Sequence, residues 1–170
     1  MKKLVLPALL ALTLAACSST GPETAGTSVE DRGAGVATVT AGSASGTGIA
    51  ALTDPNNILS KRSVFFDFDS FVIKPEARPL IEAHARFLVQ NPQMRMLVQG
   101  NTDERGSREY NLALGQKRAD VVKQALMLLG AKEAQIESVS LGEEKPRCED
   151  RTEACYGENR RGDMLYSGEF

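Results

Sequence analysis

The chain has 170 residues, with 20 Lys and Arg against 22 Asp and Glu, which gives a formal net charge of −2. This length allows one domain, or one domain with a tail. A nucleic-acid-binding protein is not expected, because the chain has no excess of cations to neutralise phosphates. The sequence contains one His, so a metal site built on several histidines is excluded, as is a mechanism that needs two.

Residues 1–16 are typical of a secretory signal peptide. Lys2 and Lys3 precede an apolar run that is shorter than the roughly 20 residues of a membrane span. The end of this run, Leu14-Ala-Ala-Cys17, resembles the lipobox of bacterial lipoproteins. The resemblance implies that Cys17 becomes a lipidated N-terminus and, since Ser18 is not Asp, that the protein is retained in the outer membrane. The alternative is an ordinary signal peptide in which Cys17 is incidental.

Residues 17–57 are expected to form the lipidated anchor and a flexible linker. From Ser18 to Asn57, 26 of 40 residues are Gly, Ser, Thr or Ala, and none is aromatic. Such a segment cannot bury enough apolar surface to offset the entropy lost on ordering. All nine Phe and Tyr residues lie within residues 58–170, which we expect to form one domain.

The pattern of residues 58–170 predicts alternating strands and helices. Strands are predicted at 63–68, 94–98, 137–141 and 161–167, and helices at 75–91 and 108–129. Val64, Phe66 and Phe68 should share one face of the first strand. A short helical turn is expected in the Cys-containing loop after the third strand. The order β-α-β-α-β-β indicates an α+β fold, with the first two strands parallel and the helices on one face of a small mixed sheet.

Acidic residues follow the first two predicted strands, at Asp69 and Asp103. Ligands tend to bind beyond the carboxyl ends of parallel strands, so these two residues are candidate ligand contacts. Arg118 lies on the next helix, and two carboxylates with one guanidinium suit a zwitterion that carries an ammonium and a carboxylate. Spacing alone does not place Arg118 beside Asp103. The alternative is that these charges are solvated or cap the helix.

Motifs over about residues 60–167 resemble the peptidoglycan-associated lipoproteins (Pal), whose C-terminal domain is OmpA-like. The motifs are Phe66-Asp-Phe-Asp69, Ile73-Lys-Pro-Glu76, Gly100-Asn-Thr-Asp-Glu-Arg-Gly106, Glu109-Tyr-Asn111, Leu114-Gly115, Arg118-Ala119 and Asn159-Arg-Arg161. The resemblance implies non-covalent binding of peptidoglycan, through the meso-diaminopimelate of its stem peptide, by Asp69, Asp103 and Arg118. It also implies an outer-membrane lipoprotein of the Tol-Pal system whose periplasmic domain binds the β-propeller TolB. Such a protein tethers the membrane to the cell wall and supports envelope integrity and constriction during cell division.

Other residues of these motifs have lesser expected roles. Phe68, Ser70, Thr102 and Arg105 are weaker candidates for ligand contact. Tyr110 and Asn111 should pack and cap rather than bind. Asn159-Arg-Arg161 should mostly tie the last strand to the site loop, with ligand contact as the alternative. His84 has no second His or Cys nearby in the sequence, so a packed or surface position is expected rather than a ligand role.

Two enzymatic alternatives are weaker. Val64-Phe-Phe-Asp-Phe-Asp69 resembles the nucleophile strand of haloacid-dehalogenase-like phosphatases, which also need a magnesium site. The chain after this motif is short for that fold and lacks the expected continuation. A cell-wall hydrolase is disfavoured by the single His and by the lack of an evident activated nucleophile. We therefore expect no catalysis, no cofactor and no metal.

Cys148 and Cys155 depart from the pattern expected of the Pal family. The periplasm is oxidising, and a bridge between them would stabilise the fold by about 2.5 kcal/mol in the chain-entropy estimate. A disulfide is therefore expected. The alternatives are two free thiols or half of a zinc site, and a Cα separation above about 7 Å would forbid the bridge.

Overall fold

In the computed structural model, residues 49–170 are described. The predicted signal peptide, Cys17 and most of the predicted linker therefore lie outside the described residues. None of the helices in 49–170 is long and apolar enough to cross a membrane.

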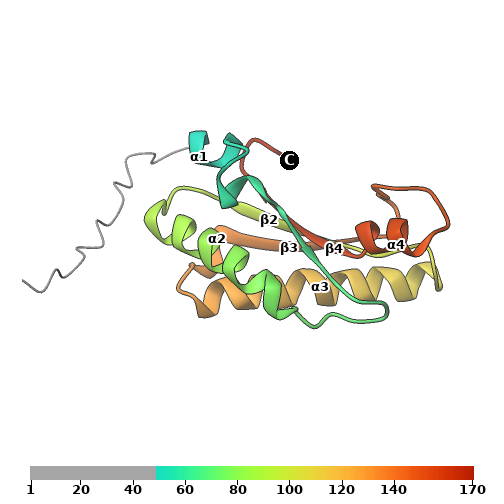
Figure 1. Cartoon of the computed structure of the whole chain (residues 1–170). Coiled ribbons are helices and arrows are strands. Elements are labelled where there is room, and N and C mark those ends of the chain that lie inside the picture. The colour runs from blue at the N-terminus through green and yellow to red at the C-terminus, as the bar shows by residue number, and fades with distance from the viewer. Residues whose placement is uncertain (1–48) are drawn as a thin grey trace, which may run out of the picture. The chain divides into compact units, whose positions relative to one another are not determined.

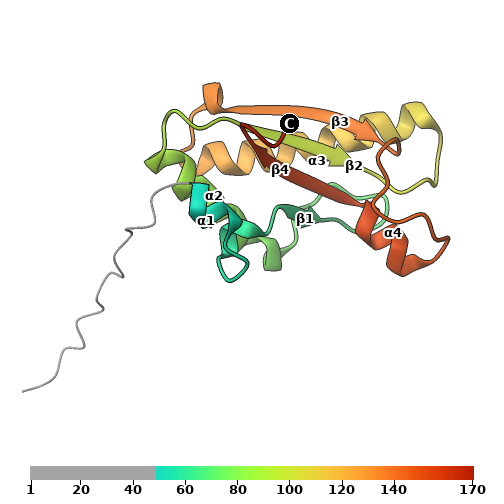
Figure 2. The ribbon, with the colours of Figure 1, turned by 90° about the horizontal axis from the view of Figure 1, so that it is seen from above.

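A four-stranded mixed sheet organises the fold, in the order β1-β4-β2-β3 (Figures 1 and 2). The strands are β1 (Ser63–Phe65), β2 (Met96–Asn101), β3 (Ile136–Gly142) and β4 (Arg161–Tyr166). β4 pairs antiparallel with β1 and β2, and β2 pairs parallel with β3. β1 and β2 are therefore parallel, as predicted, although β4 lies between them. The carboxyl ends of β1, β2 and β3 consequently lie at the same end of the sheet.

Two helices, α2 (Arg78–Gln90) and α3 (Arg108–Leu128), pack on one face of this sheet, as predicted (Figure 1). A 3₁₀ turn, Pro75–Ala77, precedes α2. The Ser107 hydroxyl caps α3 by accepting the backbone N–H of Tyr110. The core between the helices and the sheet is built from apolar side chains that include Val64, Phe66, Ile81, Leu88, Val98, Val122, Leu126 and Met164.

Helix α3 approaches the sheet backbone to backbone at two glycines. A Cβ on Gly100 would lie 1.8 Å from the carbonyl oxygen of Gly115, and a Cβ on Gly115 would lie 2.3 Å from Ser140 Oγ. A larger residue at Gly100 would therefore push the helix away from β2. This contact sets the distance between α3, which carries Arg118, and the strand end that carries Asp103.

The first strand is shorter than predicted, and Phe68 does not share the core face with Val64 and Phe66. β1 ends at Phe65 because its partner β4 begins at Arg161, which pairs with Phe65. Phe68 therefore lies in the following loop with 56% of its surface exposed.

The predicted linker boundary at residue 57 also needs correction. Residues Ile49–Thr53 form a short helix, α1, and Leu52 is buried in the hydrophobic core. The Arg62 guanidinium donates to the Leu52 carbonyl at 3.1 Å and pairs with Glu169 at 2.9 Å. The composition of residues 18–57 does not reveal this one buried leucine, because Gly, Ser, Thr and Ala make up most of the segment.

The loop before β4 contains the predicted disulfide and a helix. Cys148 and Cys155 are bonded, with their Cα atoms 5.3 Å apart, within the range that a bridge allows. Cys155 lies in α4 (Glu153–Asn159), which corresponds to the short helical turn expected there. The expectation of a disulfide is thus confirmed.

His84 is a buried core residue, as expected. Its Nδ1 lies 2.8 Å from Tyr166 Oη, and its Nε2 lies 2.8 Å from the carbonyl oxygen of Lys61. A carbonyl can only accept, so Nε2 carries the proton and Nδ1 accepts from the tyrosine. Burial lowers the pKa of His84 from 6.5 to about 4, because a charged imidazole loses its hydration there.

This lowered pKa predicts a loss of stability in mild acid. Below pH 6.5 the unfolded chain protonates His84, but the folded chain does so only near pH 4. The free energy of unfolding should therefore fall by about 3 kcal/mol over this interval. Urea denaturation from pH 7 downward measures it, and His84→Gln should flatten the curve. Parallel curves for the two proteins would contradict this assignment.

Candidate ligand-binding site

A pocket of about 200 Å³ lies beyond the carboxyl ends of β1 and β2. It is lined by Phe68, Asp69, Thr102, Asp103, Arg105, Gly106, Tyr110, Asn111, Leu114, Arg118 and Arg160. The three main candidates from the sequence, Asp69, Asp103 and Arg118, thus meet in one place. Of the four weaker candidates only Ser70 is not among the lining residues.

Arg118 is fully buried and holds the two site loops together. Its Nε donates to the Ser70 carbonyl at 2.8 Å, Nη1 to the Asn101 carbonyl at 2.9 Å and Nη2 to the Asp67 carbonyl at 3.1 Å. A guanidinium has five N–H groups, so one N–H remains on each terminal nitrogen. Burial lowers the pKa of Arg118 to about 10, so the group stays charged at neutral pH.

The partners of Arg118 differ from those of the other buried arginines. Arg160 pairs with Asp103 at 3.1 Å, and Arg161 pairs with Asp163 at 2.8 Å. Within residues 49–170, the hydrogen bonds of Arg118 all go to backbone carbonyls. A buried charge without a directly paired carboxylate is costly, so this site favours an anionic group on a ligand.

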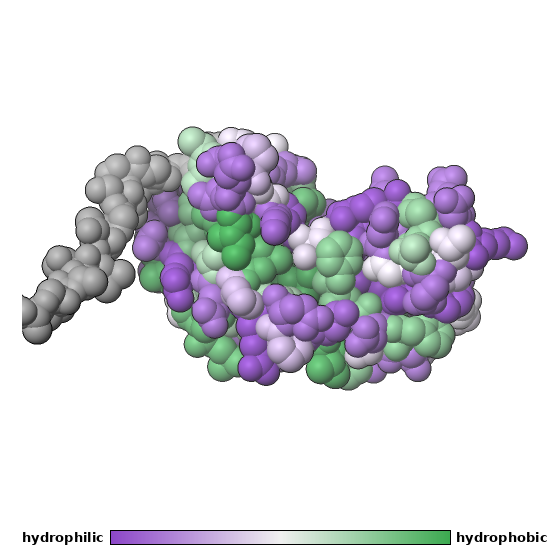
Figure 3. All heavy atoms as spheres, in the orientation of Figure 1, coloured by the Kyte–Doolittle hydropathy of each residue, from purple (hydrophilic) through white to green (hydrophobic). Residues whose placement is uncertain are grey.

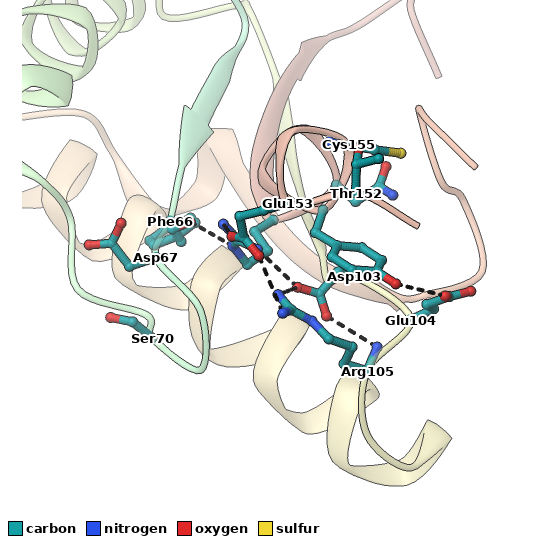
Figure 4. Close-up of polar contacts among 12 residues, drawn as sticks. Phe66, Asp67, Ser70, Asp103, Glu104, Arg105, Thr152, Glu153 and Cys155 are labelled. Carbon is teal, nitrogen blue, oxygen red and sulfur yellow. Dashed lines mark hydrogen bonds and ion pairs between the residues drawn. The ribbon is translucent and has the colours of Figure 1, made fainter. Parts of the chain in front are cut away.

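Asp103 is buried at the centre of a charged cluster (Figure 4). Its Oδ2 accepts from Arg105 Nη2 at 2.7 Å and from Arg160 Nη1 at 3.1 Å, and its Oδ1 accepts from the Arg105 backbone N–H at 3.1 Å. Burial alone raises the pKa of this carboxyl, but the hydrogen bonds from Arg105 and Arg160 outweigh burial and hold it below the usual value. Asp103 is therefore ionised and keeps a lone pair on Oδ1 for a ligand donor.

Arg105 is clamped between two aromatic rings at the rim of the pocket. Its guanidinium carbon lies 4.1 Å from the Phe68 ring centre and 4.4 Å from that of Tyr156. Nε of Arg105 and Oγ1 of Thr102 are buried without a hydrogen-bond partner among the described residues. Buried polar atoms are nearly always hydrogen-bonded, so these two atoms are candidate contacts for a ligand.

Asp69 and Tyr110 both line the pocket and are hydrogen-bonded to each other. Asp69 has a left-handed backbone conformation, with φ of 52°, which Asp tolerates better than most residues. Its exposed carboxylate accepts the hydroxyl of Tyr110, and this bond raises the pKa of the phenol. Tyr110, which was expected to pack rather than bind, therefore also lines the pocket. The position of Tyr110 in the first turn of α3, directly after the loop that carries Asp103, indicates in the sequence that it can lie near Asp103.

The Asn159-Arg160-Arg161 segment connects the last strand to the site, as expected. Arg160 Nε donates to the Phe66 carbonyl at 3.1 Å, besides pairing with Asp103. Arg160 thus joins the ends of β1 and β2 and also lines the pocket.

The geometry does not suit the metal-dependent alternative. The exposed Asp67 pairs with Lys74 at 3.3 Å and is not among the lining residues of the pocket. In Figure 4 its side chain points away from the Asp103 cluster. Across residues 49–170, no group of three His, Cys, Asp or Glu side chains is placed to hold a metal ion.

Residues 65–160 match the sequence model of the OmpA family. The chain is 39% identical over 153 residues to a peptidoglycan-associated lipoprotein of Haemophilus influenzae, with 90% of each chain covered. It is 40% identical over 161 residues to one of Pseudomonas putida, covering 92% of this chain and 93% of that protein. The chain belongs to the OmpA family, among its peptidoglycan-associated lipoproteins. The names of these relatives describe lipoproteins rather than enzymes, in agreement with the expected lack of catalysis.

Solved structures support this family assignment. The crystal structure of the peptidoglycan-associated lipoprotein from Burkholderia pseudomallei matches with a TM-score of 0.68 and 54% identity, covering 69% of this chain and 99% of that one. The C-terminal domain of Helicobacter pylori MotB matches with a TM-score of 0.58 at 22% identity, covering 63% of this chain and 84% of that one. That second likeness concerns the fold alone. The predicted α+β, OmpA-like fold is thus confirmed.

The contacts of Arg118 predict a large effect of its removal on stability. Arg118→Met should lower the free energy of unfolding by about 3–5 kcal/mol, because three backbone carbonyls in buried or partly buried hydrogen bonds lose a charged donor. The exposed neighbour Lys117→Met should change it by less than about 0.5 kcal/mol. Urea denaturation at neutral pH compares the two variants. Equal stabilities would mean that Arg118 does not hold the site loops.

Proposed function

We propose that the protein is an outer-membrane lipoprotein whose domain binds peptidoglycan non-covalently, through the meso-diaminopimelate of the stem peptide. The observation that carries the proposal is the buried Arg118 guanidinium, which lacks a carboxylate partner among the described residues and lines a pocket shared with Asp69 and Asp103. The names of the relatives, which describe association with peptidoglycan, support peptidoglycan as the polymer that is bound.

Diaminopimelate suits this pocket because one of its carbons carries both a free ammonium and a free carboxylate. The carboxylate would accept the two remaining N–H groups of Arg118, as a charge-assisted pair. The ammonium would donate to the carboxylate of Asp69 and to Oδ1 of Asp103. Thr102 Oγ1 and Arg105 Nε, which are buried without partners in residues 49–170, would supply further hydrogen bonds to the ligand.

The same proposal covers the anchor and the Tol partner. Cys17 would carry the lipid and the segment after it would span the distance to the cell wall. This link would tether the outer membrane to the cell wall and support constriction at division.

TolB would bind a surface that overlaps the pocket. Apolar side chains are exposed along β1 and the loop after it, at Phe65, Phe68, Phe71 and Val72, and green atoms gather on this face in Figure 3. Competition between soluble TolB and peptidoglycan for the purified protein tests whether the two bind exclusively.

Asp69→Asn tests the binding site with little disturbance of the fold. Asn has the same shape and tolerates the left-handed conformation of this position, but it lacks the charge that the ligand ammonium requires. The affinity for diaminopimelate-type peptidoglycan should fall by about ten- to hundredfold, as measured by co-sedimentation with purified cell wall.

Asp67→Asn is the matched control. Asp67 lies two residues away and is exposed, and its side chain pairs with Lys74 rather than lining the pocket. This variant should sediment with cell wall as the wild type does. Wild-type binding by Asp69→Asn, or an equal loss in both variants, would overturn the assignment of the site.

A further inference from the structure

A second carboxylate lies behind the arginines that hold Asp103. Glu153 Oε1 accepts from Arg160 Nη2 at 2.7 Å, and Glu153 Oε2 accepts from Arg105 Nη1 at 3.3 Å. Both guanidinium groups therefore donate to two carboxylates, those of Asp103 and Glu153. Glu153 is not among the residues that line the pocket, so it acts on a ligand only through these arginines.

The position of Glu153 is set by the disulfide loop. Glu153 is the first residue of α4, and Thr152 Oγ1 caps this helix by accepting the backbone N–H of Cys155 at 3.3 Å. Cys155 is buried and bonded to Cys148. Asn159, at the end of the same helix, donates to the Cys148 carbonyl at 2.7 Å. The disulfide thus joins the first half of α4, close to Glu153, to the loop before the helix, and the hydrogen bonds of Asn159 hold the other end of the helix.

Charge balance gives Glu153 a role beyond packing. Arg105 and Arg160 both donate to Oδ2 of Asp103, so two positive charges converge on one carboxylate. Glu153 supplies the second negative charge, because it accepts one hydrogen bond from each of these two guanidinium groups. Without it, the surplus positive charge would oppose a ligand ammonium at Asp103, and Arg105 would lose one of the contacts that orient it.

We propose that Glu153 is a positioning residue for the ligand site and that the Cys148–Cys155 disulfide holds it there, so that affinity for the ligand depends on this disulfide. The inference rests on the proposed function and adds a redox-sensitive support to it. A dithiol reductant would supply two electrons and two protons, giving two cysteine thiols and its own oxidised disulfide. The start of α4 would then be released from the loop, and Glu153 would lose its fixed distance to the arginines.

The experiment is a titration of a muramyl peptide that contains meso-diaminopimelate, with the mature protein and its variants. Glu153→Gln should weaken binding about two- to fivefold, the range of a partly exposed ion pair. Glu158→Gln is the matched control, because Glu158 lies on the same helix, is exposed, and makes no side-chain hydrogen bond or ion pair within the described residues. It should bind as the wild type does.

A double-mutant cycle separates positioning from general stability. In an Arg105→Gln background, Glu153→Gln should have a smaller effect on affinity than in the wild type, because one of the two guanidinium groups through which Glu153 acts on the site is already absent. A merely structural role would give additive effects. Dithiothreitol should weaken peptide binding by the wild type more than by Glu153→Gln, and circular dichroism checks that the reduced protein remains folded.

The outcomes distinguish this inference from the function on which it rests. A wild type that does not bind the peptide overturns the proposed function and this inference together. A wild type that binds, with Glu153→Gln binding equally well, overturns the inference alone. Additive effects in the cycle, or equal losses in wild type and Glu153→Gln on reduction, also overturn it.

Discussion

The buried guanidinium of Arg118 is the interaction on which the site depends. It donates to carbonyls of the loop after β1, at Asp67 and Ser70, and of the end of β2, at Asn101. These two segments are separated by α2 in the sequence and by β4 in the sheet, so one side chain joins loops that no direct strand pairing connects. The close contact between Gly100 and Gly115 brings α3 near enough for Arg118 to reach both.

The arrangement explains why the same residue serves the fold and the ligand. Three N–H groups of Arg118 go to the backbone, and the two that remain belong to a cation that burial has stripped of water. Arg160 and Arg161, by contrast, each pair directly with an aspartate of the domain. In the proposed account a ligand carboxylate forms an ion pair with Arg118, as Asp103 does with Arg160. Specificity then comes from an incomplete ion pair rather than from a large apolar cavity.

The sequence allowed the fold class and the two aspartates to be predicted, because strand ends can be located from apolar runs. The resemblance to Pal placed Arg118 at the site, which spacing alone could not do. The carbonyl partners of Arg118 could not be predicted, since every residue has a backbone carbonyl and the sequence does not show which ones accept from a side chain. The insertion of β4 between β1 and β2 was missed for a similar reason, as strand order depends on contacts distant in sequence. Leu52 was missed because one buried leucine does not change the composition of a long polar segment.

The most direct test of the account is a calorimetric titration with two muramyl tripeptides that differ only at the third residue, meso-diaminopimelate or L-lysine. Lysine keeps the ammonium but lacks the carboxylate assigned to Arg118. The account predicts that the diaminopimelate peptide binds and that the lysine peptide binds about ten- to hundredfold more weakly. Equal affinity for the two peptides would contradict it, because the buried guanidinium would then have no part in recognising the ligand.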